Sequence, residues 1–165
     1  DGFHTYHVGE LGTWVHNANC CDFITTSSGQ SVDLRGLTQK ERLSLEREAN
    51  VASITGGKIA ATPRSVNGKT ILEDVWIIDK NGGRLTGIDV YGKNGEMILV
   101  GGPGKNSSDK VWQSTEKALI AVKTEAATKG VKAQVYYQRG NSDRFQELIK
   151  KSEKILGKGN VFIFD

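Results

Sequence analysis

The hydrophobic pattern of this chain changes at residue 38, where apolar positions begin to recur at the three- and four-residue spacing of a helix. Thr38 and Glu41 have the spacing of a capping box, in which each side chain binds a backbone amide at the start of the helix. One acid, Glu48, lies on the apolar stripe, and Gly56 can end the helix. The pattern therefore predicts a helix from Thr38 to about residue 53.

Two later segments show the same helical periodicity. The first begins at Ser108 or Asp109, where either side chain can cap the first turn, and it ends at Gly130. The second begins at Ser142 and ends at Gly157. An apolar stripe along each segment is typical of a helix that packs on a core.

Runs of β-branched and aromatic residues between these segments predict strands. The Asn94-Gly95 pair, which separates two such runs, is a strong signal for a hairpin. The order is one helix, three or four antiparallel strands, a helix, a strand, a helix and a last, buried strand. It predicts an α/β fold with a mixed sheet and helices on both faces. The predicted strands are 58–61, 71–79, 84–91, 96–100, 131–138 and 161–164.

The first part of the chain differs from the rest. Residues 1–21 contain all three histidines and end in the adjacent pair Cys20 and Cys21. We predict two free thiols, because neighbouring cysteines rarely reach disulfide geometry. Residues 22–37 are rich in Ser and Thr and are predicted to be a linker. Residues 38–165 are predicted to form the functional domain.

Composition and charge limit the function classes without naming one. The formal net charge is +3 and the pI is about 8.8, which is compatible with a nucleic-acid partner but not specific for one. No apolar run approaches the length of a membrane span, so we predict no transmembrane segment.

The chemistry of the predicted domain must come from side chains other than His and Cys, because neither occurs after residue 37. This argues against a histidine-based ribonuclease, a cysteine nucleophile and a serine hydrolase. Asp89 lies in the strand before the Asn-Gly turn, and Lys105 follows the strand after it, so the two side chains can meet at one end of a hairpin. A carboxylate and an ammonium so placed suit a metal-activated water beside a phosphodiester.

In the order of its elements, αβββαβ with an added helix and strand, this part of the chain resembles the PD-(D/E)xK restriction-endonuclease-like superfamily. Asp89 matches the strand Asp of that family, Glu48 its helix Glu and Lys105 its motif lysine. The resemblance implies that Glu48 and Asp89 hold Mg²⁺, Mn²⁺ or Zn²⁺ and that Lys105 acts on the attacking water or the scissile phosphate. Gln138 and Arg139, which end a later strand, are candidates for binding substrate phosphates.

The chain departs from the family motif at Pro103, which stands two positions before Lys105, where the family has an acid. A backbone carbonyl, Ser107, Ser108 or Asp74 could replace this third ligand, because sites for hard cations accept carbonyl and water oxygens. Asp74 and Ser107 are also candidates for residues that contact the metal ligands without binding the metal themselves.

The first 21 residues carry a second resemblance. The sequences HTYHVG at 4–9 and WVHNA at 14–18 are similar to the end of a HINT (hedgehog/intein-type) pretoxin domain. Such domains precede C-terminal toxin modules of bacterial polymorphic and contact-dependent toxins. The resemblance implies a fragment of a secreted effector that acts in the cytoplasm of a target bacterium and is held in check by a cognate immunity protein. It favours a nuclease, with tRNA slightly preferred over DNA as the substrate.

Two alternatives remain open on the sequence. One is a metal-independent ribonuclease toxin of another fold, which uses Lys, Arg, Thr or Asp and keeps its activity in EDTA. The other is a binding module without catalysis, which the missing motif acid would allow.

Overall fold

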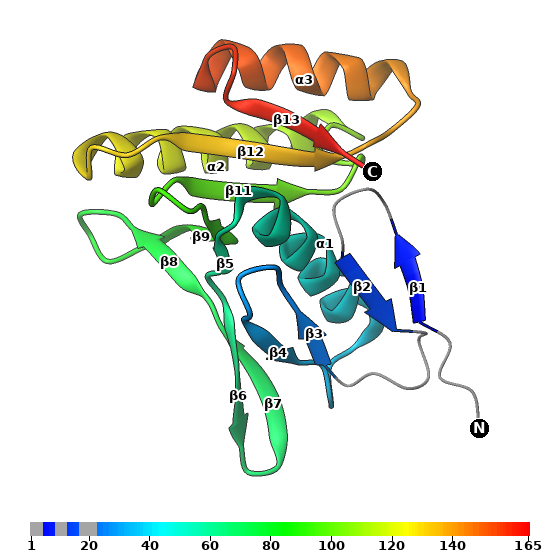
Figure 1. Cartoon of the computed structure of the whole chain (residues 1–165). Coiled ribbons are helices and arrows are strands. Elements are labelled where there is room, and N and C mark those ends of the chain that lie inside the picture. Colours follow the sequence, from blue (N-terminus) through cyan, green and yellow to red (C-terminus); the bar gives the residue numbers. More distant parts are fainter. Residues whose placement is uncertain (1–4, 9–12, 17–22) are drawn as a thin grey trace.

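The computed structural model describes residues 5–8, 13–16 and 23–165, and its centre is a five-stranded mixed sheet (Figure 1). The strand order is β13-β12-β11-β10-β5. β10 runs antiparallel to both of its neighbours, whereas β11, β12 and β13 are parallel. The five strands are β5 (Lys58–Ile59), β10 (Val90–Tyr91), β11 (Met97–Gly101), β12 (Ala133–Gln138) and β13 (Val161–Phe164).

Three helices in the described residues begin where the sequence predicts. They are α1 (Gln39–Thr55), α2 (Asp109–Thr128) and α3 (Asp143–Leu156). Thr38 and Glu41 form the complete capping box, and Gly56 ends α1 in the left-handed conformation. Ser108 and Ser142 cap α2 and α3, each with its side chain accepting a backbone N–H. None of the described helices is long and apolar enough to cross a membrane.

The helices cover both faces of the sheet, as the element order predicts. Residues of β11 alternate between two cores, because successive side chains of a strand point to opposite faces. Ile98 faces α1 and packs with Leu45 and Val90, whereas Leu99 faces α2 and α3 and packs with Leu119. The α/β class and the mixed sheet are thus confirmed. β13 is only partly buried at the edge of the sheet, so the prediction of a buried last strand was wrong.

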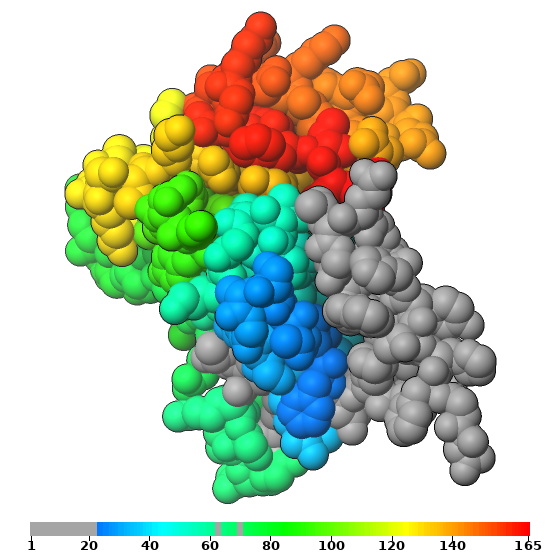
Figure 2. All heavy atoms as spheres, in the orientation of Figure 1, coloured from blue at the N-terminus to red at the C-terminus, as the bar shows by residue number. Residues whose placement is uncertain are grey.

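The segment predicted to be a linker is instead folded. It forms a hairpin of β3 (Phe23–Thr25) and β4 (Ser31–Asp33). Val32 and the following Leu34 and Leu37 are buried in the core on the α1 side. In Figure 2 the blue spheres of this segment lie directly against the cyan spheres of α1. The polar composition misled the prediction because the three apolar residues are scattered among turn residues.

Two predicted strands are each divided at an acidic residue. The segment 71–79 becomes β7 (Lys69–Glu73) and β8 (Val75–Ile78), with Asp74 between them. The segment 84–91 becomes β9 (Arg84–Ile88) and β10, with Asp89 between them. β7 pairs with β6 (Thr62–Val66), and β8 pairs with β9, so two hairpins project from the central sheet (Figure 1).

The break at Asp89 has a packing cause. In a regular strand, Ile88 and Val90 would point to the same face. Here Ile88 packs in the core under α2 and α3, whereas Val90 packs in the core under α1. The chain must turn between them, and Asp89 lies at that turn.

The hairpin of β1 (Thr5–Val8) and β2 (Thr13–His16) lies in the region that resembles a pretoxin domain. The predicted free thiols, Cys20 and Cys21, lie outside the described residues.

Candidate functional site

Glu48 is a buried acid on the inner face of α1. Its side chain lies on the stripe that carries Leu45 and Ala52 into the core, and the residue is 7% exposed. The Ser44 hydroxyl, one helical turn earlier, donates a hydrogen bond of 3.1 Å to Glu48 Oε1. Burial raises the pKa of the Glu48 carboxyl to about 8, and the charges of Asp89 and Asp74 add to the rise, whereas the Ser44 hydrogen bond opposes it.

Asp89 is the second acid of the site and lies at the junction between β9 and β10. The backbone N–H of Val100, on the neighbouring strand β11, donates a hydrogen bond of 2.7 Å to Asp89 Oδ2. Burial raises the pKa of the Asp89 carboxyl to about 6. The Val100 hydrogen bond and the positive charge of Lys105 oppose this rise, and the charge of Asp74 adds to it.

These pKa values separate the two carboxyls. Asp89 loses its proton at a lower pH than Glu48, because a backbone N–H and the charge of Lys105 stabilise the ionised Asp89. Two acids that titrate apart in this way are common where a protein performs acid–base chemistry or binds a cation.

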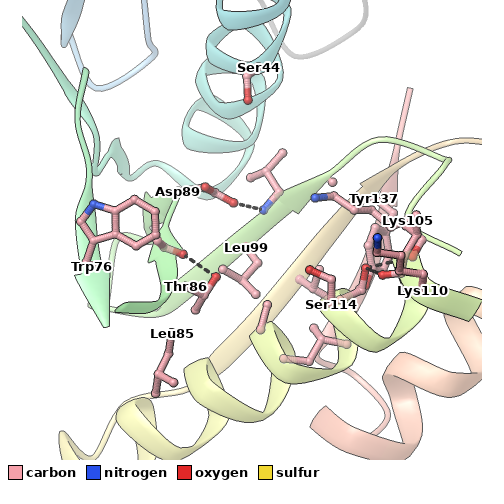
Figure 3. Close-up of a pocket in the computed structure, with 18 residues that line it drawn as sticks. Ser44, Trp76, Leu85, Thr86, Asp89, Leu99, Lys105, Lys110, Ser114 and Tyr137 are labelled. Atoms are coloured by element: carbon pink, nitrogen blue, oxygen red, sulfur yellow. Dashed lines mark hydrogen bonds between the residues drawn. The ribbon is translucent and has the colours of Figure 1, made fainter. Parts of the chain in front are cut away.

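Lys105 and Asp74 approach this pair from two different loops. Lys105 follows the end of β11, where the Thr115 hydroxyl of α2 donates a 2.9 Å hydrogen bond to its backbone carbonyl. The side chain reaches toward Asp89 along the edge of β11 (Figure 3). Gly101 makes room for it, because a Cβ at that position would lie 3.0 Å from Lys105 Cγ and 2.9 Å from the Tyr137 ring. Asp74 is exposed at the break between β7 and β8 and acts on both acids through its charge.

An open cavity of about 610 Å³ lies beside these groups (Figure 3). Asp89, Lys105 and Ser44 of α1 line it, whereas Glu48 and Asp74 do not. The β8–β9 hairpin and α2 contribute much of the lining, and residues of β11 and β12 complete it. The main lining side chains from the hairpin and from α2 are Trp76, Leu85 and Thr86, and Lys110, Ser114 and Thr115.

The other candidates from the sequence lie apart from the acids. Gln138 Oε1 accepts a 2.8 Å hydrogen bond from Arg47 Nε, so its side-chain oxygen is engaged within the protein. Arg139 forms an ion pair with Asp165 at the end of the chain. The backbone N–H of Ser107 donates to the Gly104 carbonyl, and Ser107 is not part of the cavity wall.

The structure also places residues at the site that the sequence analysis did not consider. Ser44 could have been found, because it stands four positions before Glu48 and so shares its helix face. Arg47, which does not line the cavity, is brought to Gln138 across 91 positions of sequence, a contact that no local pattern predicts. Trp76 and Lys110 come to the same cavity from β8 and α2, which likewise depends on the tertiary fold.

The acid pair has the chemistry that a hard divalent cation requires. Carboxylate oxygens are the preferred ligands of Mg²⁺ and Mn²⁺, and such ions commonly take one or two carboxylates and fill the remaining positions with water or carbonyls. Within the described residues, no group of three His, Cys, Asp or Glu side chains converges as a metal site. Glu48 and Asp89 are carboxyls of the kind that such an ion binds.

Comparison with known protein families, with characterised proteins and with solved structures finds no match to this chain.

Proposed function

We propose that this chain is a metal-dependent endonuclease toxin that hydrolyses phosphodiester bonds of nucleic acid. The observation that carries the proposal is the pair of buried carboxyls, Glu48 and Asp89, both with raised pKa values, of which Asp89 lines an open cavity together with Lys105. A structural role alone gives no reason to bury two acids of like charge next to each other, because each raises the cost of ionising the other.

Four groups of this chain would have distinct roles in metal binding and catalysis. Glu48 and Asp89 would hold the cation, and Glu48 would release its proton when it does so, because a ligating carboxylate must be ionised. Val100 N–H fixes the orientation of the Asp89 carboxylate. Lys105 would neutralise charge on the scissile phosphate as the bond breaks. A bound divalent cation supplies a Lewis acid and lowers the pKa of its bound water.

The biological setting belongs to the same proposal. The pretoxin resemblance of residues 1–21 supports an effector used in competition between bacteria, released into the cytoplasm of a target cell and neutralised by an immunity protein. The net charge of +3 suits a polyanionic substrate and an acidic inhibitor surface. tRNA is slightly favoured over DNA as the substrate.

A second candidate function rests on the separation of the two pKa values. At neutral pH, Asp89, which lines the cavity and ionises before Glu48, could take a proton from the attacking hydroxyl. This chemistry describes a ribonuclease that needs no metal.

Cleavage of purified tRNA and plasmid DNA by the whole chain tests both candidates. The assay is run with Mg²⁺, Mn²⁺ or Zn²⁺ and with EDTA. We expect cutting that requires a divalent ion and stops in EDTA, and the substrate that is degraded identifies the target. Cutting of RNA that continues in EDTA would replace the first candidate with the second. Failure to cut either substrate under any condition would leave only a binding function.

A further inference from the structure

Large apolar side chains remain exposed at the cavity beside the acids. Trp76 is 37% exposed and Leu85 is 50% exposed, and both lie on the β8–β9 hairpin where it forms the cavity wall. The Arg84 guanidinium packs over the Trp76 ring, 4.9 Å from the ring centroid, and so orients the indole. Exposed apolar groups that gather at a concave site are typical of ligand contacts.

The opposite wall of the cavity is positively charged. Lys105 and Lys110 both line it, and Figure 3 shows them across the cavity from Trp76 and Leu85. Neither lysine forms an ion pair with a residue in the part of the chain that the structure describes. Two unpaired amines at the rim of a partly apolar cavity are complementary to an anionic ligand that also has a flat apolar part.

We propose that this cavity binds one unpaired nucleotide of a single-stranded segment. The base would lie against Trp76 and Leu85, and its phosphate would lie near Lys105 and Lys110. The position of the phosphate rests on the proposed nuclease function. The binding of a base is argued from the lining of the cavity alone. Aromatic side chains hold unpaired bases by stacking, which works for any base because each has a π face.

The size of the cavity suits one unpaired nucleotide. A volume of about 610 Å³ accommodates one ligand of nucleotide size. A base within a duplex is stacked on its neighbours and paired, and it reaches such a pocket only after it leaves the stack. The substrate region is therefore a loop or a single strand rather than intact duplex.

The test measures binding in EDTA, so that metal-dependent cutting does not interfere. Fluorescence anisotropy follows a labelled, unstructured RNA, the DNA of the same sequence, and each strand annealed to its complement, with the whole wild-type chain. Two variants probe the site, Trp76→Ala and Lys110→Ala. Their matched controls are Ile78→Ala, an apolar residue of the same strand that is 48% exposed, and Lys117→Ala, an exposed lysine of α2; neither control residue lines the cavity.

We expect the wild-type chain to bind the single strands at least about tenfold more tightly than the duplexes, and Trp76→Ala to weaken single-strand binding by about tenfold. Lys110→Ala is expected to weaken it more than Lys117→Ala does and to reduce its salt dependence. Stronger binding of the RNA strand than of the DNA strand, or the reverse, shows which of the two nucleic acids the cavity prefers.

Equal binding of single strands and duplexes would overturn the inference, as would effects of Trp76→Ala and Lys110→Ala no larger than those of their controls. These outcomes are independent of the cleavage assay. A chain that binds single strands through Trp76 but cuts nothing would retain the subsite and lose the nuclease function. If the wild-type chain cuts nucleic acid but Trp76→Ala and Lys110→Ala bind single strands as well as it does, the nuclease function would stand and the nucleotide subsite would be rejected.

Discussion

Glu48 and Asp89 are held in different ways, and this difference matters for their chemistry. Glu48 receives a single side-chain hydrogen bond, from Ser44 on its own helix, whereas Asp89 receives a backbone N–H from a neighbouring strand and feels the charge of Lys105. Asp89 therefore ionises first as pH rises. A cation placed between the two acids would lower both pKa values, so metal binding and ionisation of Glu48 are linked.

The raised pKa of Glu48 predicts how stability depends on pH. An ordinary glutamate has a pKa of 4.5, and Glu48 has a pKa of about 8 in the folded chain. Between these values the folded state holds a proton that the unfolded state has lost, so the contribution of Glu48 to stability, fully present below pH 4.5, is lost as pH rises through about 8. Glu48→Gln removes this loss. In EDTA at high pH we expect it to raise Tm by at least about 2–4 °C relative to wild type, with a smaller gain at low pH.

Glu46→Gln is the matched control for this prediction, because Glu46 is an exposed glutamate on the same helix. Thermal unfolding of the wild type and both variants across the pH range gives the comparison. If the plot of Tm against pH for Glu48→Gln stays parallel to that of the wild type at every pH, the raised pKa of Glu48 would be contradicted.

These residues also mark the limit of what the sequence could predict. Glu48 could be found because an acid on the apolar stripe of a well-capped helix breaks its pattern. Asp89 could be found because a hairpin signal places its strand next to the one that leads to Lys105. Their functional roles stay predictions. The roles of Gln138 and Arg139 in substrate binding also stay predictions, and strand position did not indicate their partners Arg47 and Asp165, which are remote in sequence.

At the scale of elements, helix ends were predicted well and strand ends poorly. Caps are local, since a Thr or Ser and the residues three positions later decide them. The division of the strand at Asp89 is not local, because it arises from the packing of Ile88 and Val90 in different cores. The cavity lies beside the break at Asp89, between the β8–β9 hairpin and α2. The sequence of no single element predicts this cavity, because several elements form it.

The loop after β11 provides a prediction about an element. Gly101→Ala would place a methyl group within 3.0 Å of both Lys105 Cγ and the Tyr137 ring, and the Tyr137 ring is held by a buried hydrogen bond to Ser152. Lys105 must then move. We expect a stability loss of about 1–3 kcal/mol and a clear fall in cleavage rate.

Gly104→Ala is the control in the same loop, because a Cβ there would meet nothing within 4 Å. It is expected to retain wild-type stability and most of the activity. Cleavage rates and denaturant unfolding of the two variants provide the readout, and equal behaviour of both would remove the role assigned to Gly101.

At the scale of the whole molecule, the folded unit begins earlier than the sequence suggested. Among the residues whose burial the structure describes, the members of both hydrophobic cores lie from Ile24 onward, and the core on the α1 side includes Val32, Leu34 and Leu37. Gln30 adds to this attachment, because its side-chain amide exchanges two hydrogen bonds with the backbone of Ile59 on β5. Residues 23–37 are thus a structural part of the unit that carries the candidate site.

Truncation tests this boundary. A chain that begins at residue 23 keeps every member of both cores and is expected to unfold with the same cooperativity as the whole chain. A chain that begins at residue 38 loses three buried aliphatic side chains, each worth about 1.5–3 kcal/mol, which is enough to unfold an ordinary domain. Circular dichroism melts distinguish the two. A stably folded shorter chain would show that the hairpin is dispensable and that the functional unit does begin at residue 38.

The central claim is that Glu48 and Asp89 act together as the metal-binding acids of a nuclease. The most direct measurement is the rate of tRNA and DNA cleavage by the whole chain with and without Mn²⁺, for the wild type, Asp89→Asn and Asp109→Asn. Asp109 is a matched acid whose side chain is 94% exposed at the start of α2. We predict metal-dependent cutting that falls at least about 100-fold in Asp89→Asn and is unchanged in Asp109→Asn. Equal, metal-dependent cutting by all three proteins would contradict the assignment of Asp89.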